Sequence, residues 1–160
     1  MTAFDADLQL RLQDLMARYA MALDGGRFED WPAFFTEDAI YKIVSSENHA
    51  QGLPLGVIDC RGQGMLRDRV MALREANIYE PHRYRHMLMP PVVTGRDGDT
   101  VSVETGYHLA RIMREGETTL FSTGKYLDRV TATPDGTLKF AERLVVFDSK
   151  RIDTLLVFPI

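Results

Sequence analysis

The stretch Ala76-Asn77-Ile78-Tyr79-Glu80-Pro81-His82-Arg83-Tyr84-Arg85-His86 separates a largely helical part of the chain from a part made of long strands. Pro81 cannot continue a helix and biases Glu80 towards an extended conformation, so we expect the preceding helix to end here. Beyond Pro81 the side chains alternate with the period of two that is typical of a strand. One face carries Tyr84, His86 and Leu88, and the other carries Arg83, Arg85 and Met87.

Two histidines, His82 and His86, lie on this predicted strand. On one face of a strand they are roughly 13 Å apart, at about 3.3 Å per residue, which is too far for both to bind one metal ion. The stretch therefore favours a polar, hydrogen-bonded strand surface over a pair of metal ligands.

Helical spacing of apolar residues dominates the start of the chain. It predicts an amphipathic first helix that stops at Gly25-Gly26 and whose apolar residues are Leu8, Leu12, Leu15, Met16, Tyr19 and Leu23. We expect a short helix over residues 30–35 and a third helix over residues 65–76. Strands are expected at 39–44 and 57–61, with a loop at 45–56.

Long strands are predicted after Pro81. Residues 101–111 alternate between apolar and polar positions, and further strands are expected at 118–130 and 138–147, with 154–158 as a candidate extension. Glu115-Gly116 and Pro134-Asp135-Gly136 are hairpin signals between them. Helices followed by a curved antiparallel sheet describe one α+β domain over residues 1–160.

Composition narrows the class of protein. The chain has 160 residues, of which 45% are hydrophobic and 26% charged, as expected of one globular domain. The net charge of −4 does not favour a nucleic-acid partner, and no apolar run approaches the ~18 residues of a membrane span. Together with an acidic N-terminus and a lone Cys60, this predicts a cytoplasmic protein without a nucleic-acid or membrane partner.

The cysteine count limits the redox chemistry open to the chain. A Rieske cluster needs two cysteines and two histidines, and other common iron–sulfur sites need four cysteines. One cysteine supplies neither ligand set, so we expect this chain to hold no cofactor and no metal by itself.

Three segments carry a resemblance that spans nearly the whole chain. They are the stretch quoted above, Trp31-Pro32-Ala33-Phe34-Phe35-Thr36, and the tail that runs from Asp148-Ser149 to Thr154-Leu155. Together the segments resemble the small (beta) subunits of aromatic-ring-hydroxylating dioxygenases, in the branch of terephthalate dioxygenase and salicylate hydroxylase. The resemblance implies the fold called NTF2-like or SnoaL-like, in which a cone-shaped sheet wraps around the N-terminal helices.

The resemblance also implies partners and cofactors. In this family a homotrimer of small subunits lies beneath three large (alpha) subunits, which carry a Rieske [2Fe-2S] cluster and a mononuclear iron. The large subunit then inserts oxygen into an aromatic acid during aromatic degradation, with electrons from NADH through a reductase. The small subunit is a structural component of this oxidoreductase, so no residue of this chain is expected to be catalytic.

Arginine, tyrosine and histidine side chains that are not ligands suit a directional subunit interface. The residues expected to form it are Tyr79, His82, Arg83, Tyr84, Arg85 and His86. Since Arg85 and His86 lie on opposite strand faces, one is expected to point to the core and the other to a partner or the cone mouth. Tyr19, Asp24 and Trp31 are expected to be structural anchors.

Asp24 needs a partner because it lies at the C-terminal end of the first helix, where the helix dipole disfavours an anion by roughly 0.3–1 kcal/mol. We expect Arg83 or Arg85 to supply the positive charge. Further along the chain, Glu104 and His108 share a strand face and are expected to form a satisfied polar pair.

Two alternatives remain: a free-standing dehydratase or isomerase of this fold, and a small-molecule-binding protein. Enzymes of this fold use a carboxylate or histidine at the cone mouth. The candidates here are Tyr19, Asp24, Tyr41, His49, His86 and His108. Ketosteroid isomerases carry their catalytic carboxylate in the strand after a Phe-x-x-Asp-Ala segment, and the corresponding position here is Ile43, which cannot take a proton.

Overall fold

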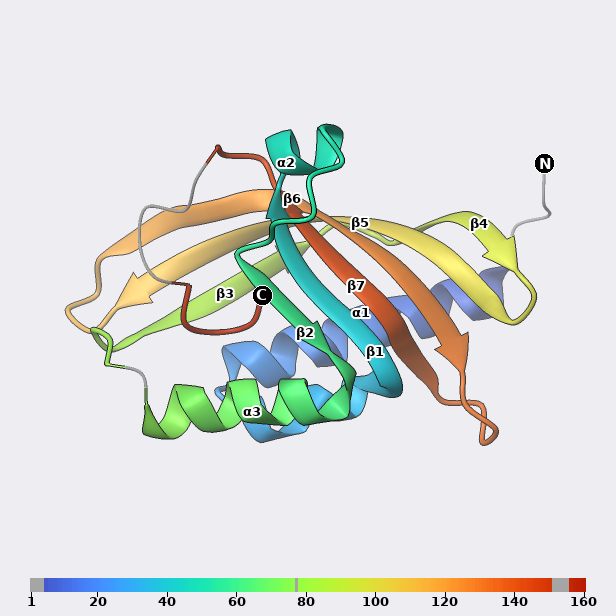
Figure 1. Ribbon diagram of the computed structural model, residues 1–160, viewed down its shortest axis with the longest axis horizontal. Helices are drawn as coiled ribbons and strands as arrows, with labels where there is room; N and C mark the ends of the chain where they lie inside the picture. Colours follow the sequence, from blue (N-terminus) through green and yellow to red (C-terminus); the bar gives the residue numbers. More distant parts are fainter. Residues whose placement is uncertain (1–4, 77, 151–155) are drawn as a thin grey trace.

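The computed structural model of the chain describes residues 5–76, 78–150 and 156–160 (Figure 1). The helices are α1 (Ala6–Asp24), the 3-10 helix η1 (Phe28–Phe34), α2 (Ser46–Ala50) and α3 (Gly62–Glu75). The strands are β1 (Phe35–Ser45), β2 (Ile58–Arg61), β3 (His82–Leu88), β4 (Val92–Asp97), β5 (Thr100–Met113), β6 (Thr118–Ala132) and β7 (Leu138–Phe147). The predicted α+β class is confirmed.

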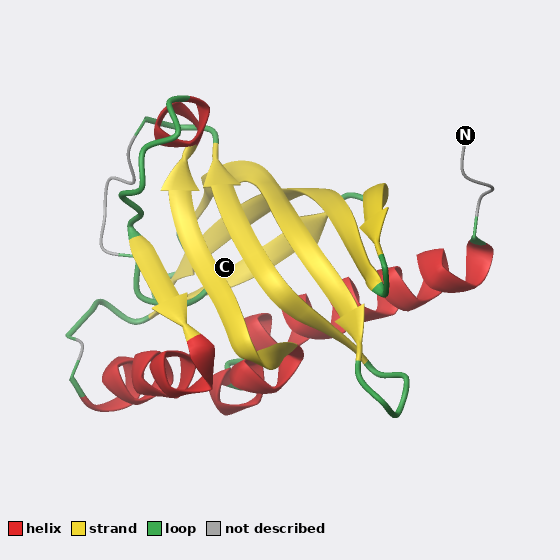
Figure 2. Cartoon of the chain, turned by 45° about the vertical axis from the view of Figure 1, so that its right-hand side comes forward, coloured by secondary structure: helices red, strands yellow, loops and turns green. Residues whose placement is uncertain are grey.

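The seven strands form one strongly curved sheet in the order β2-β1-β7-β6-β5-β3, and β4 pairs with β5 beside β3. The helices α1, η1 and α3 lie together on one side of this sheet, and the strands curve over them (Figure 2). Because β3 and β2 end the strand order, the curved sheet has two free edges and an open side between them. This is the cone that the resemblance implies.

One strand pair departs from the predicted antiparallel sheet. β1 and β7 run parallel, with Tyr41 opposite Arg143 and Ile43 opposite Val145, so the sheet is mixed. A parallel pair needs a long crossover connection, and the chain between these two strands provides one. Alternation along each strand cannot reveal this pairing, because it reports which face is buried and not which strand lies alongside.

The first helix begins and ends close to the predicted residues. The Asp5 side chain caps it by accepting a hydrogen bond from the Leu8 N–H at 3.0 Å, and the chain leaves it at Gly25 and Gly26. Gly26 has a φ of 71°, a conformation that other residues rarely adopt. The apolar face of α1 is buried against the sheet, through Leu12, Leu15, Met16, Tyr19 and Leu23.

Three local predictions are corrected. The segment predicted as a loop contains α2, which has no buried residue and therefore no apolar periodicity to detect. The strand β4 was not predicted, because its Val92 and Val93 are 59% and 39% exposed instead of alternating. The candidate strand at 154–158 lies partly outside the described residues, and 156–158 form no strand.

The centre of the cone holds a charged pair that the sequence analysis did not identify. Arg143 on β7 donates from Nε and Nη2 to the Asp128 carboxylate on β6, at 2.9 and 2.8 Å, and both side chains are fully buried. The Arg143 guanidinium carbon lies 4.2, 4.0 and 3.9 Å from the ring centres of Tyr19, Tyr126 and Phe140. Asp128 holds the pKa of Arg143 above its usual value, so the arginine stays charged.

Replacing Arg143 by Met is expected to lower the free energy of unfolding by about 3–5 kcal/mol, because the buried Asp128 carboxylate then lacks its counter-charge. Arg18→Met is the matched control, since its pair with Asp14 is exposed and such pairs contribute below about 1 kcal/mol. Denaturant unfolding of both variants measures the difference. Equal losses would mean that the buried pair does not stabilise the fold.

Alkaline pH is expected to unfold the protein through its tyrosines. Burial raises the pKa of Tyr107 to about 12, and it also raises the pKa of four further tyrosines, namely Tyr19, Tyr41, Tyr84 and Tyr126. The folded state therefore holds these protons more tightly than the unfolded state, whose tyrosines titrate near 10. Their contribution to stability is complete below about pH 10 and is lost as the pH rises towards 12 and beyond.

Tyrosinate absorbance and circular dichroism, followed together from pH 8 to 12, measure this coupling; the pH values bracket the tyrosine pKa of about 10. Ionisation of most tyrosines should coincide with unfolding, while protein in guanidinium should titrate near pH 10. Ionisation of most tyrosines near pH 10 with the fold intact would contradict the prediction.

Candidate subunit interface

Strand β3 gives the quoted stretch two chemically different faces. Tyr84 and His86 point inward and are buried, while Arg83 and Arg85 point outward. The Arg85 side chain is 62% exposed, and the His86 side chain is 0% exposed. The alternation expected for this stretch, with one of Arg85 and His86 inside and the other outside, is therefore confirmed.

Asp24 closes the free edge of β3. Its carboxylate accepts hydrogen bonds from the His86 N–H at 3.0 and 3.2 Å, and it lies 2.6 Å from Nδ1 of the same residue. An ionised carboxylate only accepts, so Nδ1 carries the proton of this contact. A side chain bound to an edge strand in this way blocks the pairing of another strand at that position.

The Asp24 carboxylate has partners from two residues of β3, Arg85 and His86. Arg85 Nη1 lies 3.9 Å from the carboxylate, whereas both donors of His86 are closer, and Arg83 lies on the exposed face of β3. The prediction that Arg83 or Arg85 pairs with Asp24 is confirmed for Arg85. It missed His86, because a backbone N–H on an edge strand becomes a donor only once the strand order is known.

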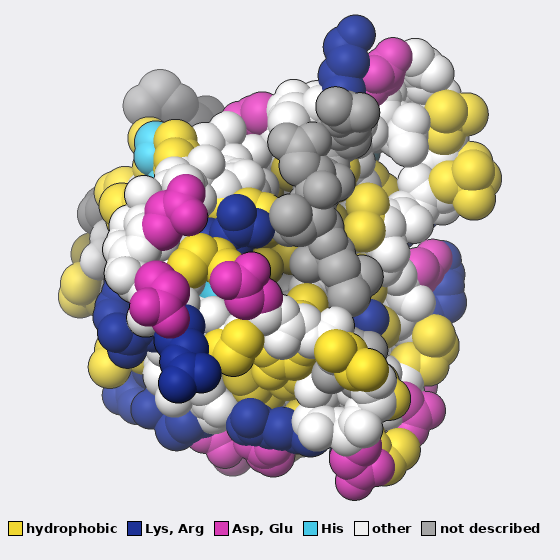
Figure 3. Space-filling model, turned by 90° about the vertical axis from the view of Figure 1, so that its left-hand side faces the viewer, with side chains coloured by type: hydrophobic (Ala, Val, Ile, Leu, Met, Phe, Trp, Pro, Cys, Tyr) yellow, Lys and Arg dark blue, Asp and Glu magenta, His cyan; other side chains and the backbone are white. Residues whose placement is uncertain are grey.

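The inward side of β3, together with Tyr79 in the segment before it, contacts the C-terminal segment, residues 156–160. Phe158 packs against Tyr79, His82 and Tyr84, with ring centres 5.4, 4.8 and 5.4 Å away, and it stacks on Phe28 of η1 at 4.8 Å. Three of the six residues expected at a subunit interface thus hold the tail of their own chain. Figure 3 faces this end of the molecule, where apolar side chains gather among charged ones.

Deeper in the cone, the expected anchors meet the end of the same segment. Tyr19 and Tyr41 both donate from their hydroxyls to the main-chain oxygen of Ile160, at 3.1 and 2.9 Å, and Trp31 Nε1 donates to the Tyr19 hydroxyl at 3.1 Å. All four residues are 0% exposed. The C-terminal segment therefore fills the inside of the cone.

The remaining candidates for acid–base chemistry do not come together. His49 is exposed on α2 and His108 is exposed on β5, while Ile43 is buried. The expected pair of Glu104 and His108 is corrected, since Glu104 lies 3.2 Å from Lys125 Nζ on the neighbouring strand. Only Asp24 and His86 lie within hydrogen-bond distance of each other, and both side chains are buried.

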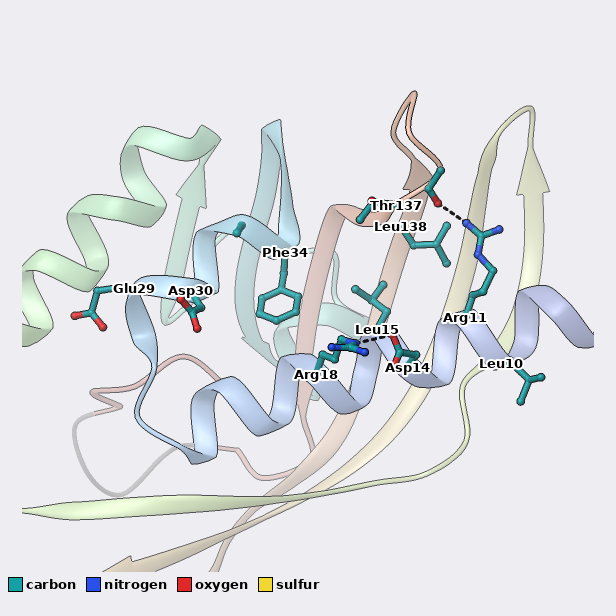
Figure 4. Close-up of a pocket in the computed structure, with 12 residues that line it drawn as sticks. Leu10, Arg11, Asp14, Leu15, Arg18, Glu29, Asp30, Phe34, Thr137 and Leu138 are labelled. Atoms are coloured by element: carbon teal, nitrogen blue, oxygen red, sulfur yellow. Dashed lines mark hydrogen bonds and ion pairs between the residues drawn. The ribbon is translucent and has the colours of Figure 1, made fainter.

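Two of the grooves on the surface lie beside η1, outside the cone. The larger, of about 740 Å³, runs between α1, η1 and the β6–β7 turn (Figure 4). Its charged groups are engaged, since Arg18 lies 2.7 Å from Asp14 and Arg11 donates to the Gly136 carbonyl. The smaller, of about 540 Å³, lies between η1 and α3, where Arg74 lies 2.7 Å from Glu29 and lowers the pKa of that carboxylate to about 2. Neither groove includes a candidate residue from the sequence.

The sequence analysis missed Asp128 and Arg143, although a signal for them existed. Both lie at inward positions of the predicted strands 118–130 and 138–147, on the faces that bury Tyr126 and Val145. Opposite charges at inward positions of two strands joined by a tight hairpin indicate a buried pair. The role of residues 156–160 had no such signal, because their partners are scattered over the whole chain.

The described part of the chain comprises residues 5–76, 78–150 and 156–160. Within it, no group of three or more His, Cys, Asp or Glu side chains is placed to hold a metal ion. Within the same residues, no helix is long and apolar enough to cross a membrane.

Comparison with known proteins places these features in a family. A model of the SnoaL-like domain matches residues 6–144. The beta 1 subunit of the terminal oxygenase component of terephthalate 1,2-dioxygenase from Comamonas sp is 44% identical over 152 residues, which are 95% of this chain and 98% of that protein. The small subunit of anthranilate 1,2-dioxygenase from Burkholderia cepacia is 46% identical over 91% of this chain and 90% of its own length.

A solved structure agrees with both relatives. It is a beta subunit assigned to the aromatic-ring-hydroxylating dioxygenases, from Novosphingobium aromaticivorans, and it is 40% identical with a TM-score of 0.88. The match covers 97% of this chain and 98% of that one. With the SnoaL-like cone and this identity over almost its whole length, the chain belongs to the small (beta) subunits of the aromatic-ring-hydroxylating dioxygenases.

Proposed function

We propose that this chain is the non-catalytic small subunit of a dioxygenase that hydroxylates an aromatic acid during aromatic degradation. Its relatives are named as small subunits of terephthalate and anthranilate dioxygenases, and they match it over nearly its whole length. One observation carries the proposal: the cone, where an enzyme of this fold would bind its substrate, is filled by residues 156–160 of the chain itself.

The assembly that follows is a homotrimer of this chain with three large subunits in the cytoplasm. The large subunits hold the Rieske [2Fe-2S] cluster and the mononuclear iron, and a reductase supplies electrons from NADH. The cysteine count of this chain supports the placement of the cluster on the large subunit. The chain has one cysteine, and the common iron–sulfur clusters need at least two. The role of this chain is to position and stabilise its partners.

The outer face of β3 and its neighbours is the surface that we propose contacts a partner. Arg85 lies opposite Ala110 on β5, which in turn lies opposite Leu120 on β6. Leu120 is 62% exposed, and Met87 on the same face of β3 is 48% exposed. Arginine and methionine are both enriched at protein–protein interfaces relative to the rest of the surface.

Within the six residues proposed for the interface, two roles follow from the geometry. Arg83 and Arg85 point outward and are proposed to contact the partner directly. The other four hold the strand in place from the inside, through the C-terminal segment and Asp24, and these are Tyr79, His82, Tyr84 and His86.

A free-standing dehydratase or isomerase is the second candidate, and one observation favours it. Asp24 and His86 are two titratable groups at 2.6 Å, the arrangement of a general base and its orienting carboxylate. The burial of His86 counts against this candidate, since its side chain is 0% exposed and no substrate atom reaches it in this structure. The isolated chain is therefore not expected to turn over such substrates.

Arg85→Ala and His86→Ala are expected to separate assembly from folding. Arg85→Ala should leave the melting temperature of the isolated chain nearly unchanged and weaken binding to the large subunit, since its side chain is exposed. His86→Ala should cost about 1–3 kcal/mol of stability, because the buried Asp24 carboxylate loses a donor. Melting curves and sizing with and without the large subunit measure both effects.

Arg18→Ala on α1 serves as the control for that comparison, because it removes an exposed arginine on a different element. It should change neither stability nor assembly by a measurable amount. If Arg85→Ala assembles as well as Arg18→Ala, the outer face of β3 is not the contact surface.

Iron is expected only in the assembled complex. The chain purified alone should contain no stoichiometric iron. Co-expression with a large subunit that carries Cys-x-His and Cys-x-x-His spacings should yield a larger complex with both iron and visible absorption. Metal analysis and native mass determination test this. Iron bound by the isolated chain, or failure to co-purify with any such large subunit, would contradict the proposed function.

A further inference from the structure

The C-terminal segment binds inside the cone as a ligand does, through an oxygen atom at one end and a ring at the other. At the inner end, the main-chain oxygen of Ile160 accepts from the hydroxyls of Tyr19 and Tyr41, and the Ile160 N–H donates to the Tyr41 hydroxyl at 2.9 Å. Trp31 donates to the Tyr19 hydroxyl, which leaves the proton of that hydroxyl directed at the Ile160 oxygen. Two buried phenols thus converge on one acceptor.

At the outer end, the Phe158 ring occupies an aromatic pocket. It stacks on Phe28 with 17° between the ring planes, and it meets Tyr79 and Tyr84 edge-on at 86° and 76°. Between the two ends, Arg69 Nη2 on α3 donates to the carbonyls of Leu156 and Val157, at 2.8 and 3.3 Å. These contacts need one aromatic ring and carbonyl oxygens. Many small aromatic molecules carry both kinds of group.

The electrostatics of the cone define the kind of ligand. Arg143, whose guanidinium carbon lies 4.2 Å from the centre of the Tyr19 ring, is paired with Asp128. Burial also raises the pKa of both phenols, so they remain neutral donors across the physiological range. The cone therefore offers hydrogen bonds and aromatic contacts to an acceptor oxygen, and Arg69 on α3 adds a guanidinium beside the segment.

We propose that the cone is a binding site for a small aromatic compound that carries a carbonyl or carboxylate oxygen, and that the C-terminal segment occupies this site as a built-in competitor. Tyr19 and Tyr41 bind the oxygen, and the residues around Phe158 bind the ring. The apparent affinity of an external ligand falls in proportion to the fraction of molecules in which the segment leaves the site. Ligand binding and release of the segment are then one coupled event, separate from the contact surface on β3.

The test compares the full chain with a chain that ends at residue 155. Acetophenone probes a neutral carbonyl and benzoate probes a carboxylate, and calorimetry measures the binding of each. The shortened chain is expected to bind at least one of the two probes tenfold or more tightly than the full chain does. The peptide Leu-Val-Phe-Pro-Ile, added in trans, should displace the bound probe and raise the melting temperature of the shortened chain.

Tyr41→Phe in the shortened chain identifies the oxygen site, because it removes one donor and keeps the ring. It should weaken probe binding at least tenfold, whereas Phe121→Ala, which alters a ring stacked on Tyr84 away from the phenols, should weaken it much less. Tightest binding of acetophenone would assign the site to neutral carbonyl compounds, and tightest binding of benzoate would assign it to carboxylates. Binding of neither probe, or binding unchanged by Tyr41→Phe, would overturn the proposal.

Folding of the shortened chain is checked by circular dichroism before binding is measured. If it does not fold, Phe158→Ala in the full chain replaces it, since this variant empties only the aromatic end of the site. It should gain affinity for a probe relative to the parent chain and lose it again with Tyr41→Phe. A Phe158→Ala chain that binds no probe would overturn the proposal equally.

Discussion

The buried pair of Arg143 and Asp128 is the contact on which the rest of the structure depends. It joins β7 to β6 at the centre of the cone, and the three rings around the guanidinium bring α1 to the same point through Tyr19. Taking two charges out of water costs several kcal/mol per ion unless their geometry is close to ideal. The pair therefore favours one placement of α1 under the sheet, and it penalises every arrangement that separates the two charges.

This placement of α1 brings the C-terminal end of the helix to the edge of β3. Asp24, at the C-terminal end, meets the edge of β3, where it accepts from the main chain and from the ring of His86. The contact blocks the edge and orients the strand, so that two arginines face outward while a tyrosine and a histidine face inward. An exposed surface with directional donors is thus held on a rigid strand instead of a loop.

The filled cone distinguishes this chain from an enzyme with the same fold. A SnoaL-like cone can bind a substrate only when its interior is open to solvent, and here residues 156–160 supply the oxygen and the ring that a ligand would supply. A cone filled from within no longer needs a catalytic group, which is consistent with an aliphatic residue at Ile43.

Sequence patterns by themselves determined the class of this protein. Apolar spacing predicted α1, α3 and the long strands, and Pro81 marked where the strands begin after α3. The single cysteine predicted that this chain by itself supplies too few ligands for an iron–sulfur cluster. These features depend on the spacing of residues within a short stretch or on a count of residues. Both can be read directly from the sequence. Only the tertiary structure decided that β1 runs parallel to β7, that His86 is the main partner of Asp24, and that the tail fills the cone. Each of these joins residues far apart in the chain, and such contacts depend on the complete strand order, which no local pattern encodes.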